Sequence, residues 1–560
     1  MHYQILLTCG LEIGFFKTSF FDNLLFSTVD VIVLFVITLL LSFFRIRISF
    51  IITFLITLVF SFCNVLYSRF FGQYISISSF GQIENLYDNT VIQSMLSGFE
   101  YYDLYYPIAL LFFLWLLIKK RNIELSFKKG FQSLGVLLGS IVLIVFLLHI
   151  SYFFKAQGYK VLLTLNPLTH FNYLYPNWST FHKGFFRTLV IDNFIIQNAK
   201  NTPLTKDQIR KIELEYKKSD QRYTNHLVNK NIENVIFILV ESYLSETSDK
   251  IVNGKEITPF LNSLKRDSDV YYNGNMHPLV YLGESSDGQF TYMTGLLPLR
   301  SDITISRVND CAPLGLPRIL KQKRNIQHTQ IIVPTSATTW KQNTMNEVYG
   351  IDTMFSKEEY FKDNNVLIDL SDDVIFSIAS EKDKLIKSPF FSLILTMSMH
   401  QPYYRTVDST FILKDDKLPE KYLNYLNSCH FFDSQIQKYF NHLKVQGLYD
   451  KSLIIITSDH EAHPKQLDMI GKISTKTPLY IINGNIDKAK AWTGDFNQLD
   501  VYTTLLDILG IDNEWKGLGH SLLNPNYKNS VTEKIKKLSD EIIYGKYFSK
   551  PFYKNEASTH

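Results

Sequence analysis

Carboxylate and imidazole side chains follow closely after three separate apolar runs in the part of the chain after residue 230. They are Glu241 after residues 234–240, His400 after 391–397, and Asp459 with His460 after 452–457. In open α/β sheets, ligands bind at the carboxyl ends of the strands. Three strands that deliver such groups to one edge predict a divalent metal site. The alternative is that polar residues simply follow strand ends at the surface.

The runs that precede these groups have the composition of buried strands. Short apolar runs of this kind occur at 234–240, 329–333, 391–397, 452–457 and 479–482. Helical stretches such as 422–445 lie between them. Alternating strands and helices predict an α/β domain with a mostly parallel sheet and helices on both faces.

The first 155 residues have a different character. Apolar segments lie at 24–44, 48–67, 104–118 and 132–154. A helix needs about 20 apolar residues to cross a bilayer, so these segments predict four transmembrane helices. Residues 1–22 are a candidate fifth span or an interfacial segment, because Glu12 and Lys17 interrupt their apolar character.

The basic residues predict the orientation of these spans. Arg45 and Arg47 separate the first two spans, and residues 119–129 between the last two hold five more basic residues. The loop 72–103 is acidic. By the positive-inside rule the two basic loops are cytoplasmic. The sequence therefore predicts a multi-pass protein of the cell membrane, with everything after residue 155 on the extracytoplasmic side. The expected organisation is a transmembrane domain at 1–155, an extracytoplasmic connector at 156–230, a catalytic domain at 231–530 and a C-terminal tail at 531–560.

Charge and cysteine content exclude other classes of protein. A net charge of +4 over 560 residues does not indicate a nucleic-acid-binding protein, which would carry a strongly basic surface. The four cysteines include no CxxC pair, which argues against a cysteine zinc site. Cys311 and Cys429 are either a disulfide of an exported domain or two free thiols, and free thiols are favoured.

Four sequence blocks resemble the signature blocks of the alkaline phosphatase and sulfatase superfamily. In chain order they are Val240-Glu241-Ser242, Gly283-Glu-Ser-Ser-Asp-Gly-Gln-Phe290, Thr396-Met-Ser-Met-His400 and Thr457-Ser-Asp-His460. Residues 499–511 and 519–522 are similar to the end of such domains. The closest resemblance is to the lipoteichoic acid synthase-like branch of membrane-anchored phosphoglycerol transferases, in which several helices precede the catalytic domain.

The resemblance implies a role for each matching residue. Glu241, Asp459 and His460 are implied to bind one divalent cation, Mn²⁺ or Zn²⁺, with Ser285 as the fourth ligand. Ser285 takes the place of the nucleophilic threonine of the family. His400 is implied to contact the transferred phosphate or the leaving group.

Three neighbouring residues each have two interpretations. Ser286 adjoins Ser285, and only the family block favours Ser285 as the nucleophile. Asp287 is interpreted as a helix cap rather than a catalytic group, near the start of a helix expected over 287–296. His463 is either a further ligand or substrate contact, or a solvent-facing loop residue.

The region that would recognise the headgroup departs from the family. Trp340 matches a tryptophan near the substrate headgroup. Ahead of it, Val333 or Pro334 stands where the lipoteichoic acid synthases have a histidine. After it, Lys341 and Gln342 stand where they have an arginine. Glycerol phosphate specificity therefore does not follow from the family match alone.

The implied function is transfer of a phosphoglycerol-type group from a membrane phospholipid to a glycan or glycolipid at the cell surface, through a Ser285-linked intermediate. Phosphoethanolamine transfer and phosphodiester hydrolysis are alternatives within the enzyme class. A catalytically silent surface-binding ectodomain is the alternative outside it. Sulfate ester hydrolysis is disfavoured, because Ser285-Ser-Asp-Gly-Gln lacks the x-Pro-x-Arg that follows a formylglycine precursor.

Overall fold

The computed structural model describes residues 51–67, 75, 79, 85, 92, 98–119 and 204–547, except 301, 309–314, 361–368, 387–388, 404–410 and 465. The chain divides into two compact units, one of residues 1–77 with 95–197 and the other of 78–94 with 198–560. The second unit contains all the residues singled out above for chemistry.

Helices make up the described part of the first unit. They are a helix over 51–67, η2 at Tyr101–Leu104 and α4 at Tyr105–Lys119. No helix within the described residues combines the length and the apolarity that a bilayer crossing requires. The predicted spans 24–44 and 132–154, and the first residues of 48–67, lie outside the described residues.

An eight-stranded sheet forms the centre of the second unit. Its strands are β1 (Asn234–Val240), β4 (Val270–His277), β5 (His328–Ile332), β6 (Thr353–Phe355), β7 (Phe390–Leu395), β8 (Ser452–Ser458), β9 (Thr477–Ile482) and β10 (Phe496–Asn497). They lie in the order β10-β4-β9-β8-β1-β7-β5-β6. Only β9 runs against the others, since it pairs antiparallel with both β8 and β4. The predicted mostly parallel sheet is confirmed. A separate hairpin joins β2 (Ile251–Val252) to β3 (Lys255–Glu256).

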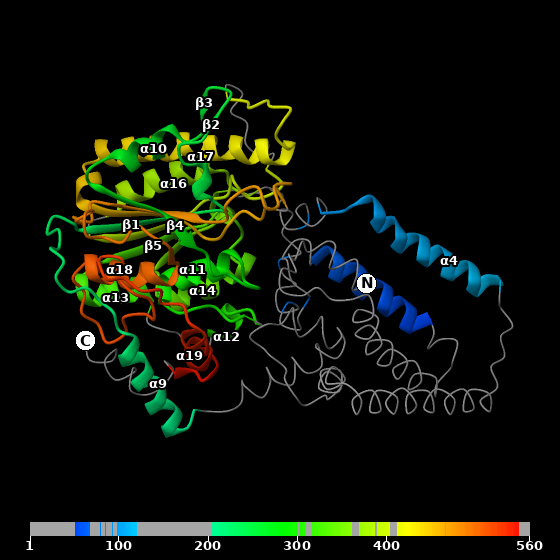
Figure 1. Cartoon of the computed structure of the whole chain (residues 1–560), viewed down its shortest axis with the longest axis horizontal. Coiled ribbons are helices and arrows are strands. Elements are labelled where there is room, and N and C mark those ends of the chain that lie inside the picture. The colour runs from blue at the N-terminus through cyan, green and yellow to red at the C-terminus, as the bar shows by residue number, and fades with distance from the viewer. Residues whose placement is uncertain are drawn as a thin grey trace, which may run out of the picture. The chain divides into compact units, whose positions relative to one another are not determined.

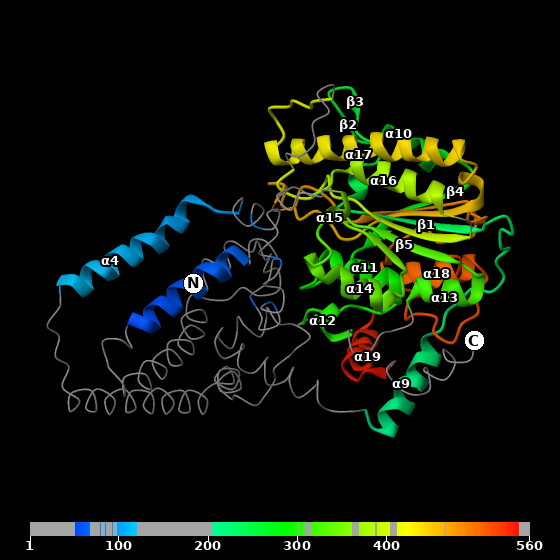
Figure 2. The same cartoon turned by 180° about the vertical axis from the view of Figure 1, so that it is seen from behind.

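Helices cover both faces of the sheet (Figures 1 and 2). On one face lie α10 (Pro259–Arg266), α16 (Asp372–Leu385) and α17 (Glu420–Val445). On the other lie α11 (Ser285–Thr294), α13 (Leu316–Arg324), α14 (Gln342–Tyr349) and α18 (Leu499–Ile508). The shorter elements are η3 (Ser245–Thr247), α12 (Ile305–Val308), η4 (Thr339–Lys341), α15 (Lys357–Tyr360) and η5 (Tyr449–Lys451).

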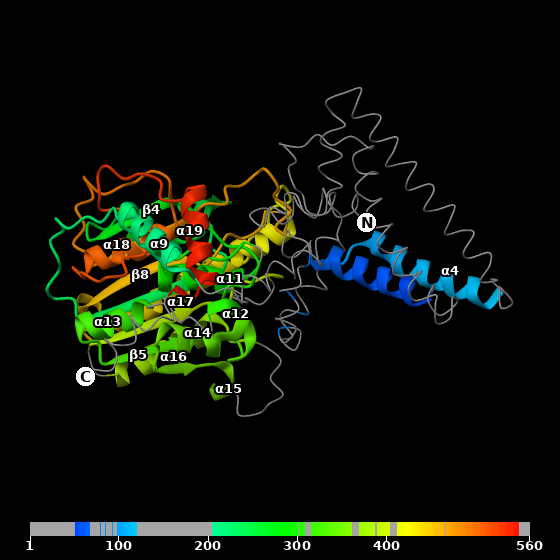
Figure 3. The same cartoon turned by 90° about the horizontal axis from the view of Figure 1, so that it is seen from below.

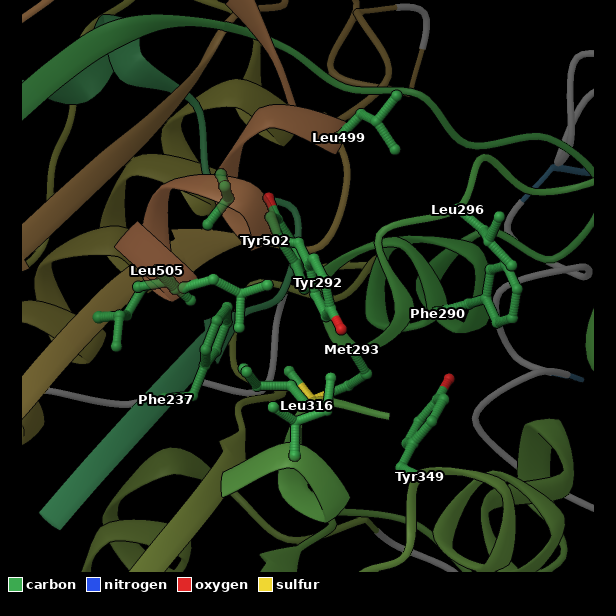
Figure 4. Close-up of a cluster of buried hydrophobic side chains, with 14 of the residues drawn as sticks. Phe237, Phe290, Tyr292, Met293, Leu296, Leu316, Tyr349, Leu499, Tyr502 and Leu505 are labelled. Atoms are coloured by element: carbon green, nitrogen blue, oxygen red, sulfur yellow. The ribbon is translucent and has the colours of Figure 1, made fainter. Parts of the chain in front are cut away.

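The side chains of the central strands alternate between two apolar cores. Val235, Phe237 and Leu239 of β1 belong to the core under α11, α13, α14 and α18. The intervening Ile236, Ile238 and Val240 belong to the core under α10, α16 and α17. Because both faces are buried, the strand sequence is continuously apolar. Figure 4 shows Phe237 gathered with Tyr292 and Met293 of α11, Leu316 of α13 and Tyr502 of α18.

Two peripheral helices complete this unit and lie side by side (Figure 3). One of them is α9 (Lys206–Ser219), which begins after Thr205, and Thr205 forms a capping box with Gln208. The region expected as a C-terminal tail contains α19 (Glu533–Tyr544), whose apolar side chains are part of the core. Ser539 of α19 binds both backbone groups of Leu297, so this helix is tied to the loop that follows α11.

Gly288 allows α11 to pack directly on the end of β8. A Cβ atom added at Gly288 would lie 2.1 Å from the carbonyl oxygen of Asp459, which is far too close. We expect Gly288→Ala to lower the free energy of unfolding by about 3 kcal/mol, because helix and strand end must separate. Thermal unfolding of the detergent-solubilised chain measures this loss.

Gly484→Ala is the matched control for this change. An added Cβ there would meet only side-chain atoms of Ile481 and Ile486, at 3.1 and 3.2 Å. We expect a change of less than about 1 kcal/mol. Equal effects of the two substitutions would contradict the close approach of α11 to β8.

Candidate active site

The adjacent strands β1 and β8 place three ionisable side chains together. The strands are parallel, and Val240 lies opposite Ser458 in the register. The next residues are therefore Glu241 on one strand and Asp459 with His460 on the other. One oxygen or nitrogen atom from each of these three side chains lies within 4.8 Å of the others, and all three residues are buried. Three of the residues predicted as metal ligands, from two distant places in the sequence, thus meet in one group.

Hydrogen bonds orient each member of this group. Asp459 Oδ1 accepts the backbone N–H groups of Ser242 (2.9 Å) and His460 (2.7 Å). Ser242 Oγ donates to Glu241 Oε1 at 2.7 Å. His460 Nδ1 lies 2.9 Å from the carbonyl oxygen of Glu461, so Nδ1 carries the proton and donates there. Nε2 of His460 is then the nitrogen that faces the two carboxylates.

Ser285 Oγ extends the group from the start of α11. It lies 3.2 Å from His460 Nε2 and 3.4 Å from Glu241 Oε2, and the residue is half-buried. Ser286, its neighbour, is turned away, because its buried hydroxyl donates to the carbonyl oxygen of Gly283 at 2.6 Å. The geometry thus separates two serines that spacing alone leaves equivalent.

A strained turn holds Ser285 in this place. Glu284 has φ 43° and ψ −118°, a combination that costs a non-glycine residue on the order of 1–3 kcal/mol. Asp287 ties the turn together, since its Oδ2 accepts the backbone N–H groups of Tyr281 (2.9 Å) and Gly283 (3.0 Å). The helix begins at Ser285, two residues earlier than expected, and Glu284 occupies the cap position. Asp287 therefore braces the turn and is not the N-cap that was expected.

Burial and mutual repulsion shift the protonation of this group. Burial, reinforced by the nearby Glu241, raises the pKa of Asp459 to about 7. Burial alone would lower the pKa of His460, but Asp459, Glu241 and Glu284 together raise it to about 10. Two carboxylates forced together in a buried site favour the binding of a cation. Their oxygens, one imidazole nitrogen and the serine hydroxyl form a ligand set that suits both zinc and manganese.

A pocket opens beside these residues. Its lining includes Glu241, Ser285, Gln289, Thr335, Thr339, Trp340, Gln342, Asp369, His400 and Asp459. His400 Nδ1 lies 2.7 Å from the carbonyl oxygen of Gln401 and donates to it, so Nε2 is the acceptor of the neutral ring. Trp340 and Lys341 both have a left-handed backbone, with φ of 52° and 55°. Trp340 and His400 thus line the same pocket as Ser285.

Some of the other candidate residues lie elsewhere. His463 is half-buried, and its Nε2 lies 3.5 Å from Glu284 Oε2, outside the group that could hold a metal. Val333 is fully buried, whereas Pro334 and Gln342 line the pocket. Cys429 is a free thiol whose pKa is raised by burial, and Cys311 lies outside the described residues.

Gln289 is a pocket residue that the sequence analysis missed. It follows Ser285 by four positions, and residues four apart lie on the same face of a helix. Once a helix is assigned from Ser285 onward, this spacing alone places Gln289 beside the predicted nucleophile. The expected helix started at 287, which obscured the relation.

The chain is similar to proteins of known class. The sulfatase family model matches residues 233–511. Lipoteichoic acid synthase from Staphylococcus aureus (strain USA300) is 28% identical to this chain over 471 aligned residues. The alignment covers 80% of this chain and 71% of that protein. The similar solved structures include two bacterial proteins. The integral membrane protein lipooligosaccharide phosphoethanolamine transferase A from Neisseria meningitidis has a TM-score of 0.53 at 14% identity, over 96% of this chain and 98% of that chain. Lipoteichoic acid synthase LtaP from Listeria monocytogenes has a TM-score of 0.46 at 16% identity, over 64% of this chain and 99% of that chain.

The sheet and its flanking helices define an α/β domain of the alkaline phosphatase and sulfatase superfamily. Within that superfamily, residues 233–511 match the sulfatase family model. The resemblance to the lipoteichoic acid synthase-like branch, first drawn from four short blocks, is confirmed over most of the chain.

The ligand group leads to a direct test of metal binding. We expect the purified chain to retain one divalent cation, and Asp459→Asn to weaken its binding at least about 10-fold, because a charged ligand is lost. Metal analysis after dialysis measures this. Asp433→Asn is the control, since Asp433 is also buried and accepts two backbone N–H groups from α10. Equal metal content in Asp459→Asn and in the unaltered chain would contradict the assignment.

Proposed function

We propose that this chain is a membrane-anchored phosphotransferase that moves a phosphoglycerol-type group from a membrane phospholipid to a glycan or glycolipid at the cell surface. One observation carries the proposal: Ser285 Oγ lies within 3.4 Å of both His460 Nε2 and Glu241 Oε2, at the wall of a pocket. The 28% identity to a lipoteichoic acid synthase supports the phosphoglycerol class.

The proposed cation ligands are Glu241, Ser285, Asp459 and His460. When bound, a divalent cation lowers the pKa of the serine hydroxyl and neutralises charge on the phosphoryl oxygens. The buried carboxylates fit this role, because burial, reinforced by the nearby Glu241, raises the pKa of Asp459 in the absence of a cation. The hydrogen bond from His460 Nδ1 to a backbone carbonyl oxygen is the support that metal-binding histidines ordinarily have.

Two transesterification steps follow from this arrangement. In the first, Ser285 Oγ forms a bond to the lipid phosphorus while the bond from phosphorus to the diacylglycerol oxygen breaks. The serine loses its proton and the diacylglycerol oxygen gains one. In the second, an acceptor hydroxyl forms the new bond to phosphorus and the Ser285 oxygen leaves as a hydroxyl. In its imidazolium form, His400 is placed to donate a proton from Nε2 to the diacylglycerol oxygen, because Nδ1 is held by Gln401.

The membrane anchor is part of the proposal. The predicted spans before residue 155 tether the catalytic domain to the surface from which the lipid comes. The similar fold of an integral membrane protein from N. meningitidis supports an arrangement of this kind. A tether brings the enzyme to its lipid donor, whereas hydrolysis of a soluble substrate has no need of one.

The adjacent serines provide a matched pair of variants. We expect Ser285→Ala to reduce diacylglycerol release at least about 1,000-fold, because the nucleophile is lost. Ser286→Ala loses only a hydrogen bond to Gly283, which costs about 1 kcal/mol of stability, and retains most of the transfer. Mass spectrometry of the peptide that contains both serines locates the adduct. An adduct on Ser286 would contradict the assignment.

The donor is tested with two labelled lipids. Phosphatidylglycerol and phosphatidylethanolamine are offered separately to the detergent-solubilised chain with manganese or zinc, and diacylglycerol is measured. We expect release from phosphatidylglycerol, and loss of that release in Ser285→Ala. Release from phosphatidylethanolamine alone would show that the transferred group is phosphoethanolamine and not phosphoglycerol. Release from neither lipid, with turnover of a soluble phosphodiester, would indicate a hydrolase, and no turnover at all would indicate a binding ectodomain.

A further inference from the structure

Two buried glutamines line the same pocket as Ser285. Gln289 comes from α11 and Gln342 from the first position of α14. Their side chains meet, since Gln342 Nε2 donates to Gln289 Oε1 at 3.3 Å. Only 1% of Gln289 and 5% of Gln342 is exposed, so both amides are almost wholly removed from bulk water.

This contact leaves half of each amide unused. Gln289 Nε2 and Gln342 Oε1 are buried and have no hydrogen-bond partner among the described residues. Buried polar atoms are rarely left unpaired, so a ligand or a trapped water is expected to meet them. Turning both amides over gives the same result, because the pair would again present one N–H donor and one carbonyl acceptor. The pair is therefore a donor and an acceptor side by side.

The position of the pair suits a headgroup attached to the nucleophile. Gln289 lies one helical turn beyond Ser285 on the same face of α11. A small group linked through phosphate to Ser285 Oγ has the pair within reach, in the pocket that both residues line. Trp340 lines the same pocket and adds an aromatic surface.

The charges around the pair favour a neutral ligand. Apart from the proposed metal ligands, Asp369 is the only acidic residue that the structure places in the described lining. Its charge is balanced by Lys357, whose Nζ lies 3.0 Å from Asp369 Oδ1. The described lining contains no lysine or arginine. A positively charged headgroup thus has no unbalanced acidic partner there apart from the proposed metal ligands.

We propose that Gln289 and Gln342 select a neutral, hydroxyl-bearing headgroup of the polyol class. A hydroxyl group accepts from Gln289 Nε2 and donates to Gln342 Oε1, so it satisfies both atoms. An ammonium group only donates, so it satisfies the carbonyl oxygen and leaves the N–H unpaired. This inference rests on the proposed group transfer and assigns its headgroup selectivity to two named side chains.

Binding of free headgroup phosphates tests the selectivity without turnover. Glycerol 1-phosphate and phosphoethanolamine are titrated by calorimetry into the detergent-solubilised full chain with manganese. We expect the unaltered chain to prefer glycerol 1-phosphate about 10-fold, because one more hydrogen bond forms. Gln289→Glu and Gln342→Glu should each lower its affinity about 10-fold and shift the preference towards phosphoethanolamine. In each case a carboxylate accepts from an ammonium group.

Gln322→Glu is the control with the same change of charge, on the exposed side of α13. It should leave both affinities unchanged. If Gln289→Glu unfolds, Gln342→Glu and the uncharged Gln342→Met decide the test, and both should lose the preference. Equal affinities in the unaltered chain, or an unchanged ratio in the pocket variants, would overturn the inference and indicate that trapped water alone satisfies the pair.

The outcome is separable from that of the proposed function. Preference for glycerol 1-phosphate that depends on the glutamines, without diacylglycerol release from any lipid, would uphold the selectivity and reject lipid transfer. Diacylglycerol release from phosphatidylglycerol with an unchanged binding ratio in both variants would uphold the function and reject the role of the glutamines.

Discussion

The architecture depends on holding two carboxylates close together in a buried place. Glu241 and Asp459 lie at the ends of adjacent parallel strands, where like charges repel and water is scarce. Such a pair is costly unless each oxygen has a partner. The backbone N–H groups of Ser242 and His460 and the hydroxyl of Ser242 supply several of these partners. The rigid sheet beneath keeps the two groups from moving apart, and positive charge compensates them: they raise the pKa of the adjacent His460 to about 10.

The same constraint explains the unusual backbone around Ser285. The serine reaches the carboxylates only if α11 touches the end of β8, and Gly288 makes that contact feasible. The chain must then turn sharply at Glu284, which has a left-handed φ. The buried carboxyl of Asp287 holds the turn through two backbone N–H groups, and burial raises its pKa to about 7. The strain is local, and the packing of α11 in the apolar core outweighs it.

The sequence predicted the strand ends well because their signal is local. A strand buried on both faces must be apolar throughout, so the polar residue that ends it is conspicuous, as at Glu241 and Asp459. β4 escaped notice because it carries Asn273, Gly274 and Asn275 in its middle. The sequence also could not predict the contact between Gln289 and Gln342, since these residues lie 53 positions apart on two different helices. Periodicity reveals which face a residue occupies, but not which distant helix lies opposite.

The strand ends and the helices contribute different parts of the pocket. Glu241, Asp459 and His460 lie at strand ends fixed by the sheet, whereas other parts of the pocket lining come from α14 and the segments around Trp340. A substitution at Gln342 changes a hydrogen-bond donor or acceptor without disturbing the pairing of β1 with β8. Replacement of Asp459 leaves the buried carboxylate of Glu241 and the imidazole of His460 without the side chain that they contact. Under the proposed function, headgroup selectivity can therefore change through single side chains on the helices, while the strand ends that carry Glu241, Asp459 and His460 tolerate little change.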